Sequence, residues 1–140
     1  MDSNTAGTAE SFKTTAATTG SVTRLRIFVD AGSTAASVIV GLYSNTTANH
    51  PGTLLATGVI NAPLAGQDNG VNVPATAVTA GQTYWIAVLG QGGLVKFRDR
   101  PGVGAGSSET SQQSGLAALP ATWITGSPFS DGRLSAVGLG

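Results

Sequence analysis

The chain has one histidine for acid–base chemistry, His50, in the turn-like sequence NHPG. A histidine acts as a general base when a carboxylate orients its ring and a nucleophile lies within reach. No motif in the sequence supplies that acid, and GxSxG, HExxH and Walker motifs are absent. An exposed turn histidine is the favoured interpretation, so we expect no catalytic residues and no enzyme activity.

The acidic residues are few and scattered. Paired carboxylates can hydrolyse glycosidic bonds, but solvated turn positions explain these acids more simply. Asp68 in GQDNG and Asp131 in FSDG are weak candidates for a structural calcium site. Neither matches a DxDxDG loop, so we favour turns and expect no cofactor. The acids considered are Glu10, Asp30, Asp68, Asp99, Glu109 and Asp131.

Flat aromatic side chains could bind sugars, whose apolar faces stack on rings while polar side chains hold the hydroxyl groups. Aromatic residues make up only 6% of the chain, and the candidates are Trp85, Trp123 and Tyr43. Because large aromatics are usually well buried, Trp123 is also interpreted as a lid plugging the end of the fold, and Tyr43 as strand-end packing. These two interpretations are favoured over exposed platforms.

Basic residues cluster in two short segments. Arg24 and Arg26 share one face of a predicted strand, and Lys96 and Arg98 share one face of another. If both strands belong to one sheet, the four form a local basic patch. Such a patch could bind an anionic glycan, a carboxylated polymer or an acidic partner. Protection of edge strands against aggregation is the favoured alternative.

The elements that position these residues are predicted to be β-strands. Glycine and proline recur every ten or so residues, and a 3.6-residue apolar stripe is missing. Short strands at this spacing predict one all-β domain over residues 1–140, an antiparallel β-sandwich with about eight to nine strands. Residues 1–7 are expected to be loose and 100–120 to form a long loop. The expected strands are 8–14, 21–30, 37–43, 53–61, 70–74, 82–89, 94–98, 121–125 and 133–139.

The segment GQTYWIAVLGQGGLVK reads as a hairpin, and its first strand is apolar on both faces. Tyr84 matches the tyrosine corner of β-sandwiches, whose hydroxyl returns to nearby backbone, which places Tyr84, Ile86 and Val88 inward. Trp85, Ala87 and Leu89 then form a second apolar row, too costly to leave in water. The long loop, another subunit or a ligand could cover that row.

Bulk composition excludes several functions. Seven basic and seven acidic residues give zero net charge, so we expect neither nucleic-acid binding nor membrane insertion. With no cysteine, disulfides and thiolate metal sites are excluded. The start, MDSNTAGTAE, does not read as a signal peptide, and we expect an excised module.

The order of GSVTRLRIFVDAG, VGLYSNTTANHPGTLLATG and VTAGQTYWIAVL resembles a group of bacterial extracellular modules. These are jelly-roll-like β-sandwiches found beside glycoside hydrolases, fibronectin type III domains and cell-surface anchors. The resemblance spans about residues 9–140 and implies a jelly-roll-like fold and an extracellular or cell-surface location. It also implies a polysaccharide or cell-surface glycan as partner.

Three functions follow as hypotheses. The first is a non-catalytic carbohydrate-binding or adhesive module of a secreted protein, with Trp85, Trp123, Tyr43, Arg98, Arg24 and Arg26 as candidate ligand-binding residues. The second is a structural spacer or surface-fibre module that self-associates through an outer sheet face. The third is a fibronectin-like protein-binding domain, for which a chain of 140 residues is long.

Overall fold

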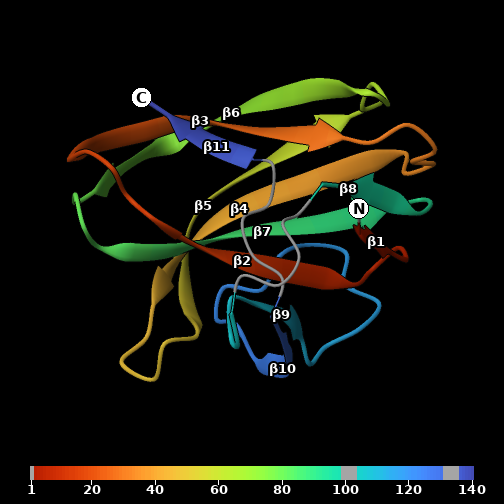
Figure 1. The fold of residues 1–140 in the computed structure, drawn as a ribbon. Coiled ribbons are helices and arrows are strands. Elements are labelled where there is room, and N and C mark those ends of the chain that lie inside the picture. The colour runs from red at the N-terminus through yellow and green to blue at the C-terminus, as the bar shows by residue number, and fades with distance from the viewer. Residues whose placement is uncertain (1, 99–103, 131–135) are drawn as a thin grey trace.

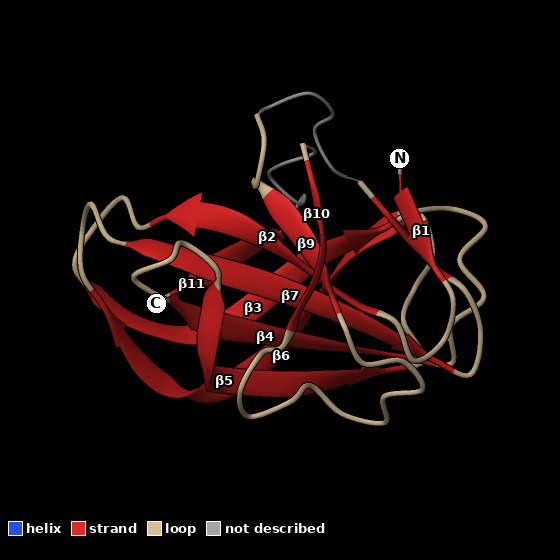
Figure 2. Ribbon diagram, turned by 90° about the horizontal axis from the view of Figure 1, so that it is seen from below, coloured by secondary structure: helices blue, strands red, loops and turns tan. Residues whose placement is uncertain are grey.

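The computed structural model describes residues 2–98, 104–130 and 136–140, and within these it contains eleven strands and no helix (Figure 2). No helix that could span a membrane occurs among the described residues. The strands are β1 Asp2–Asn4, β2 Ala9–Thr15, β3 Gly20–Val29, β4 Ser37–Asn45, β5 Pro51–Asn61, β6 Gln67–Val78, β7 Thr83–Gln91, β8 Val95–Phe97, β9 Ser108–Ser111, β10 Thr125–Phe129 and β11 Ala136–Leu139.

The strands form two antiparallel sheets (Figure 1). The five-stranded sheet has the order β1-β8-β3-β11, with β6 also paired to β3, and the six-stranded sheet has the order β10-β9-β2-β7-β4-β5. The predicted all-β antiparallel sandwich is therefore confirmed, although the strands outnumber the eight or nine expected. Jelly-roll connectivity stays a prediction.

The main core lies between the two sheets. Leu25, Ile27 and Val29 of β3 point inward and are fully buried, as the alternation in RLRIFV predicted. Phe12 of β2 and Phe97 of β8 meet edge to face in this core, with ring centroids 5.6 Å apart. The rings therefore connect the two sheets at the favoured geometry for an aromatic pair.

Strand β7 has the predicted phase. Tyr84 packs on the main core, and its hydroxyl accepts a hydrogen bond of 2.9 Å from the backbone N–H of Thr79, which is the expected tyrosine corner. Trp85, Ala87 and Leu89 form part of a second apolar cluster on the other face of the six-stranded sheet, and all three are fully buried.

The chain itself covers this second cluster. Residues 112–124, which we call the cover segment, connect β9 to β10 and pack Leu119 and Trp123 on the cluster. Backbone hydrogen bonds hold it beside the start of β5: Leu54 N–H donates to Ala121 O at 2.9 Å, and Trp123 N–H donates to Gly52 O at 3.0 Å. The apolar row of Trp85 is therefore covered by a segment of the same chain, which is one of the three coverings considered from the sequence.

The predicted hairpin over 82–98 is wrong. β7 belongs to the six-stranded sheet and β8 to the five-stranded sheet, so the glycine-rich turn between them crosses from one layer to the other. In this turn Gly93 has a φ of +154°, and a side chain there would collide with the backbone carbonyl of Thr34. The crossing therefore requires glycine at this position.

Three smaller expectations also need correction. Residues 1–7 are not all loose, because β1 pairs with β8 from Asp2↔Phe97 to Asn4↔Val95. The expected loop 100–120 contains strand β9, which pairs with β2. The strand expected over 121–125 begins only at Thr125, because residues 121–124 belong to the cover segment.

Candidate functional site

The three aromatic candidates lie together in the interior. Trp85 and Tyr43 are 0% exposed and Trp123 is 5% exposed, all in the second apolar cluster. The rings of Tyr43 and Trp123 meet edge to face, with centroids 5.2 Å apart. None of the three forms an open platform for a sugar. Trp123 is a lid, but it lies on the outer face of a sheet rather than over the end of the sandwich.

Their polar atoms are used inside the protein. The indole N–H of Trp85 donates to Asn45 Oδ1 at 2.8 Å. The hydroxyl of Tyr43 donates to Pro120 O at 2.6 Å, and burial raises the pKa of Tyr43 well above its ordinary value of 10.0. The first bond joins β7 to the last residue of β4, and the second holds β4 against the cover segment, so these polar atoms already have partners in the folded chain.

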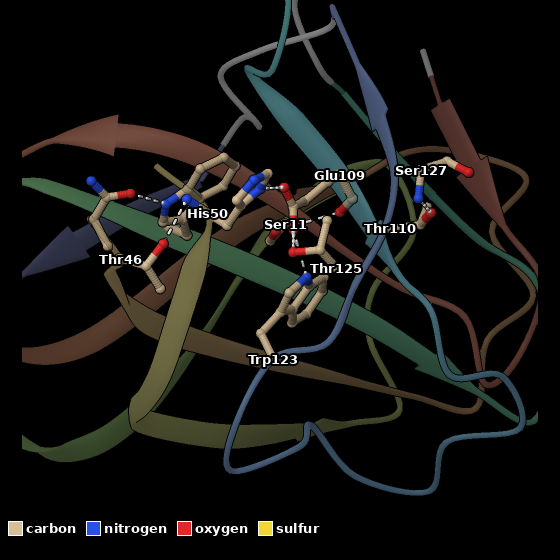
Figure 3. Close-up of polar contacts among 10 residues, drawn as sticks. Ser11, Thr46, His50, Glu109, Thr110, Trp123, Thr125 and Ser127 are labelled. Atoms are coloured by element: carbon tan, nitrogen blue, oxygen red, sulfur yellow. Dashed lines mark hydrogen bonds and ion pairs between the residues drawn. The ribbon is translucent and has the colours of Figure 1, made fainter. Parts of the chain in front are cut away.

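No motif in the sequence supplied an acid for His50, but the fold brings one from 59 positions away. His50 Nδ1 lies 2.7 Å from Glu109 Oε2. The other carboxylate oxygen accepts hydrogen bonds of 2.9 Å from Trp123 Nε1 and Thr125 Oγ1 (Figure 3). Glu109 is 1% exposed, so its expected role as a solvated turn acid is wrong. The polar sequence SSETSQQS contained no signal of this burial.

The other acids divide between interior and surface. Glu10 and Asp30 are buried, against expectation, and Glu10 accepts a hydrogen bond from the Asn4 side chain at 2.9 Å. Asp68 is exposed in strand β6 rather than in a turn. Asp99 and Asp131 lie outside the described residues. Among the residues that are described, no three possible metal-ligating side chains gather.

The basic residues share one sheet, which was the condition for a patch. The pair Val29↔Phe97 joins β3 to β8. Because inward and outward side chains alternate along both strands, Arg24, Arg26 and Lys96 occupy outward positions of the five-stranded sheet, and the exposed Arg98 follows the last residue of β8. We call these four residues the cationic face.

Edge protection does not explain this face. Arg24 and Arg26 lie on β3, which pairs with β6 on one side and with β11 on the other. Lys96 lies on β8, which pairs with both β1 and β3. Neither strand is an edge of its sheet, so the interpretation of these charges as guards of an exposed edge is wrong.

Two arginines of the cationic face are held in place by neighbours. Arg98 Nε lies 3.2 Å from Asp30 Oδ2, and its guanidinium carbon lies 4.4 Å from the ring centroid of Phe28. Its side chain is nevertheless 59% exposed, and no described residue bonds its terminal amino groups.

Arg24 is fixed in a similar way. Its Nη1 donates to Asn72 Oδ1 at 3.3 Å, and its guanidinium lies on the backbone of Gly70, where any side chain would collide with it. Arg26 is exposed and has no ion pair with a described residue. The face also carries carboxylates, since Asp30 pairs with Arg98 and Asp68 lies opposite Phe28 in register.

No protein-family model matches the chain, and no curated protein matches its sequence. Fold and site together define the class as an all-β antiparallel sandwich with a preorganised cationic face on its smaller sheet.

Proposed function

We propose that this chain is a non-catalytic binding module that holds an anionic polysaccharide on its cationic face. It would serve as part of a larger secreted or cell-surface bacterial protein, in keeping with the resemblance of its sequence to such modules. The observation that carries the proposal is that Arg24, Arg26 and Lys96 project from strands paired on both sides, where they protect no edge.

The chemistry of the face favours an anion over a neutral sugar. The three aromatic candidates for stacking on a neutral sugar, Trp85, Trp123 and Tyr43, are buried. Arginine binds sulfate and carboxylate groups through a planar fork of N–H donors. Arg98 and Arg24 are held by Asp30 and Asn72, so less side-chain entropy is lost when a ligand binds.

Matched polymers test the proposal. Dextran sulfate and neutral dextran share a backbone and differ in charge, and affinity electrophoresis compares them directly. We expect dextran sulfate to retard the protein and dextran not to. Arg98→Ala and Arg24→Ala should each weaken binding by about tenfold or more, roughly the effect of one lost charge-assisted contact. Lys13→Ala is the control, because Lys13 lies over Trp85 on the other sheet.

Three outcomes would overturn the proposal. Equal retardation by both polymers would mean that charge is not recognised. If neither polymer binds while size-exclusion chromatography shows concentration-dependent association, the structural, self-associating module becomes the better description. Loss of binding in Lys13→Ala equal to that in Arg98→Ala would place the ligand elsewhere.

A further inference from the structure

A cavity of about 400 Å³ opens at one end of the sandwich. It lies where the β2–β3 and β6–β7 connections run, at the left of Figure 1. Its inner wall includes Val22, Leu42 and Ile86 from both sheets, which are 4–8% exposed, whereas Leu25 deeper in the core is 1% exposed. The volume falls within the range of roughly 300–1,000 Å³ typical of small-ligand sites.

The described side chains that line the cavity are uncharged. None of the described residues that line it is Asp, Glu, Lys, Arg or His. The wall further in is aliphatic, with the ring of Tyr84, whose hydroxyl already accepts a bond from Thr79. Toward solvent the lining carries hydroxyl groups of Thr15, Thr18 and Ser21. The apolar wall and the hydroxyl rim are complementary to a molecule with an apolar body and a neutral polar end.

We propose that this end cavity binds an uncharged amphipathic small molecule, an aliphatic chain that ends in a hydroxyl group. The aliphatic part of the ligand lies against Val22, Leu42 and Ile86, and the ligand's hydroxyl group reaches the threonine and serine rim. An ionised group inside the cavity would lack a partner of opposite charge and would lose its hydration. The site is separate from the cationic face and goes beyond the proposed function.

A series of normal alcohols tests the inference by NMR titration of the full chain. Each methylene transferred from water to the cavity should tighten binding about fourfold, so 1-hexanol should bind on the order of tenfold more tightly than 1-butanol. We expect the shifts to centre on the amides of Ala16, Val22 and Ile86. Glucose, which has hydroxyl groups but no aliphatic chain, should cause no shifts there.

Blocking variants make the test specific to this cavity. Ala17 is exposed and lines the cavity, so Ala17→Trp should fill it and reduce hexanol affinity at least about tenfold, the loss of two or more buried methylenes. Ala65→Trp, in an exposed turn away from the cavity, is the matched control. Thr18→Trp serves as a second blocking variant if Ala17→Trp fails to fold.

Three results would overturn the inference. Glucose binding without hexanol binding would identify a sugar site. Shifts centred on exposed apolar residues such as Leu64 and Phe129 would indicate non-specific adsorption. Unchanged hexanol affinity in a folded blocking variant would place the alcohol elsewhere. Because neither the ligand nor the variants carry charge, failure here is distinguishable from failure of polyanion binding.

Discussion

At the scale of single residues, Glu109 connects three parts of the chain through one buried carboxylate. Trp123, Thr125 and His50 all direct polar atoms to it within 2.9 Å. Glu109→Ala leaves these atoms without their acceptor and should lower the free energy of unfolding by about 2–4 kcal/mol. Urea denaturation followed by tryptophan fluorescence measures the change.

Two variants of Glu109 separate the contribution of its carboxylate to stability from the contribution of the rest of its side chain. Glu109→Gln keeps one carbonyl oxygen for Trp123 and Thr125 and should cost less than Glu109→Ala. Asp68→Ala removes an exposed strand acid and should stay within about 0.5 kcal/mol of wild type. Equal effects of Glu109→Ala and Asp68→Ala would contradict the interior role of Glu109.

Tyr43 makes stability depend on alkaline pH. Burial raises its pKa in the folded protein above the ordinary value of 10.0, so the folded state favours the neutral phenol. This contribution is fully present below pH 10 and is lost as pH rises above 10, because only the unfolded chain then releases the proton. The variant Tyr43→Phe has no phenolic proton to release, so its stability should not show this loss above pH 10.

The measurement is the free energy of unfolding from pH 8 to pH 11 in both proteins. At pH 8, Tyr43→Phe should be less stable by about 1 kcal/mol, because the hydrogen bond to Pro120 is lost. Above pH 10 the difference should shrink and then reverse. Parallel curves for the two proteins would rule out Tyr43 as the source. Lysine and arginine titrations are common to both and cancel in the comparison.

At the scale of elements, the cover segment is fitted closely onto strand β4. A side-chain carbon added at Gly41 would lie 2.5 Å from Leu119 Cδ1 and 3.0 Å from Leu54 Cδ1. Gly41→Ala should therefore destabilise the protein by about 1–3 kcal/mol, the usual cost of overpacking. In the double variant with Leu119→Ala the combined cost should be less than the sum of the two single costs.

A double-mutant cycle by urea denaturation gives the coupling energy between positions 41 and 119. Gly20→Ala is the control, because nothing lies within 4 Å of the carbon it adds, and it should change stability by less than about 0.5 kcal/mol. Strict additivity of Gly41→Ala and Leu119→Ala would show that the cover segment does not pack on this strand in solution.

Local sequence predicted the elements whose residues alternate in polarity. The two faces of β3 and of β7 follow from period two, and Tyr84 fixed which face of β7 points inward. Strand β9 was missed because SETS carries no apolar residue, and its burial comes from pairing with β2 about 98 positions earlier. The turn at Gly93 was misassigned because a glycine-rich turn does not specify whether the next strand joins the same sheet.

The candidate site divides in the same way. Alternation within each predicted strand placed Arg24 and Arg26 on one face, and Lys96 and Arg98 on one face. The sequence did not show that the two strands belong to the same sheet. The need to cover the row of Trp85 followed too, since the row was apolar, but the sequence left open whether the chain, another subunit or a ligand covers it. The pairing of His50 with Glu109 joins positions 59 residues apart and has no local signal.

At the scale of the whole molecule, any attraction to polyanions must come from the arrangement of charge and not from its total. Seven basic and seven acidic residues cancel, so no net charge draws an anion from a distance. The cationic face can act only within about one Debye length, about 8 Å at physiological ionic strength. Binding to dextran sulfate should therefore weaken steeply as salt is added.

We expect the affinity for dextran sulfate to fall on the order of a hundredfold between 50 and 300 mM NaCl, because several ion contacts release counterions together. Arg98→Ala should show a shallower dependence on salt, since it forms one contact fewer, whereas Lys13→Ala should keep the wild-type slope. Binding of 1-hexanol in the end cavity provides the internal comparison, and it should not weaken over the same range. Affinity for dextran sulfate that does not change with salt would mean that the polymer is held by something other than the cationic face.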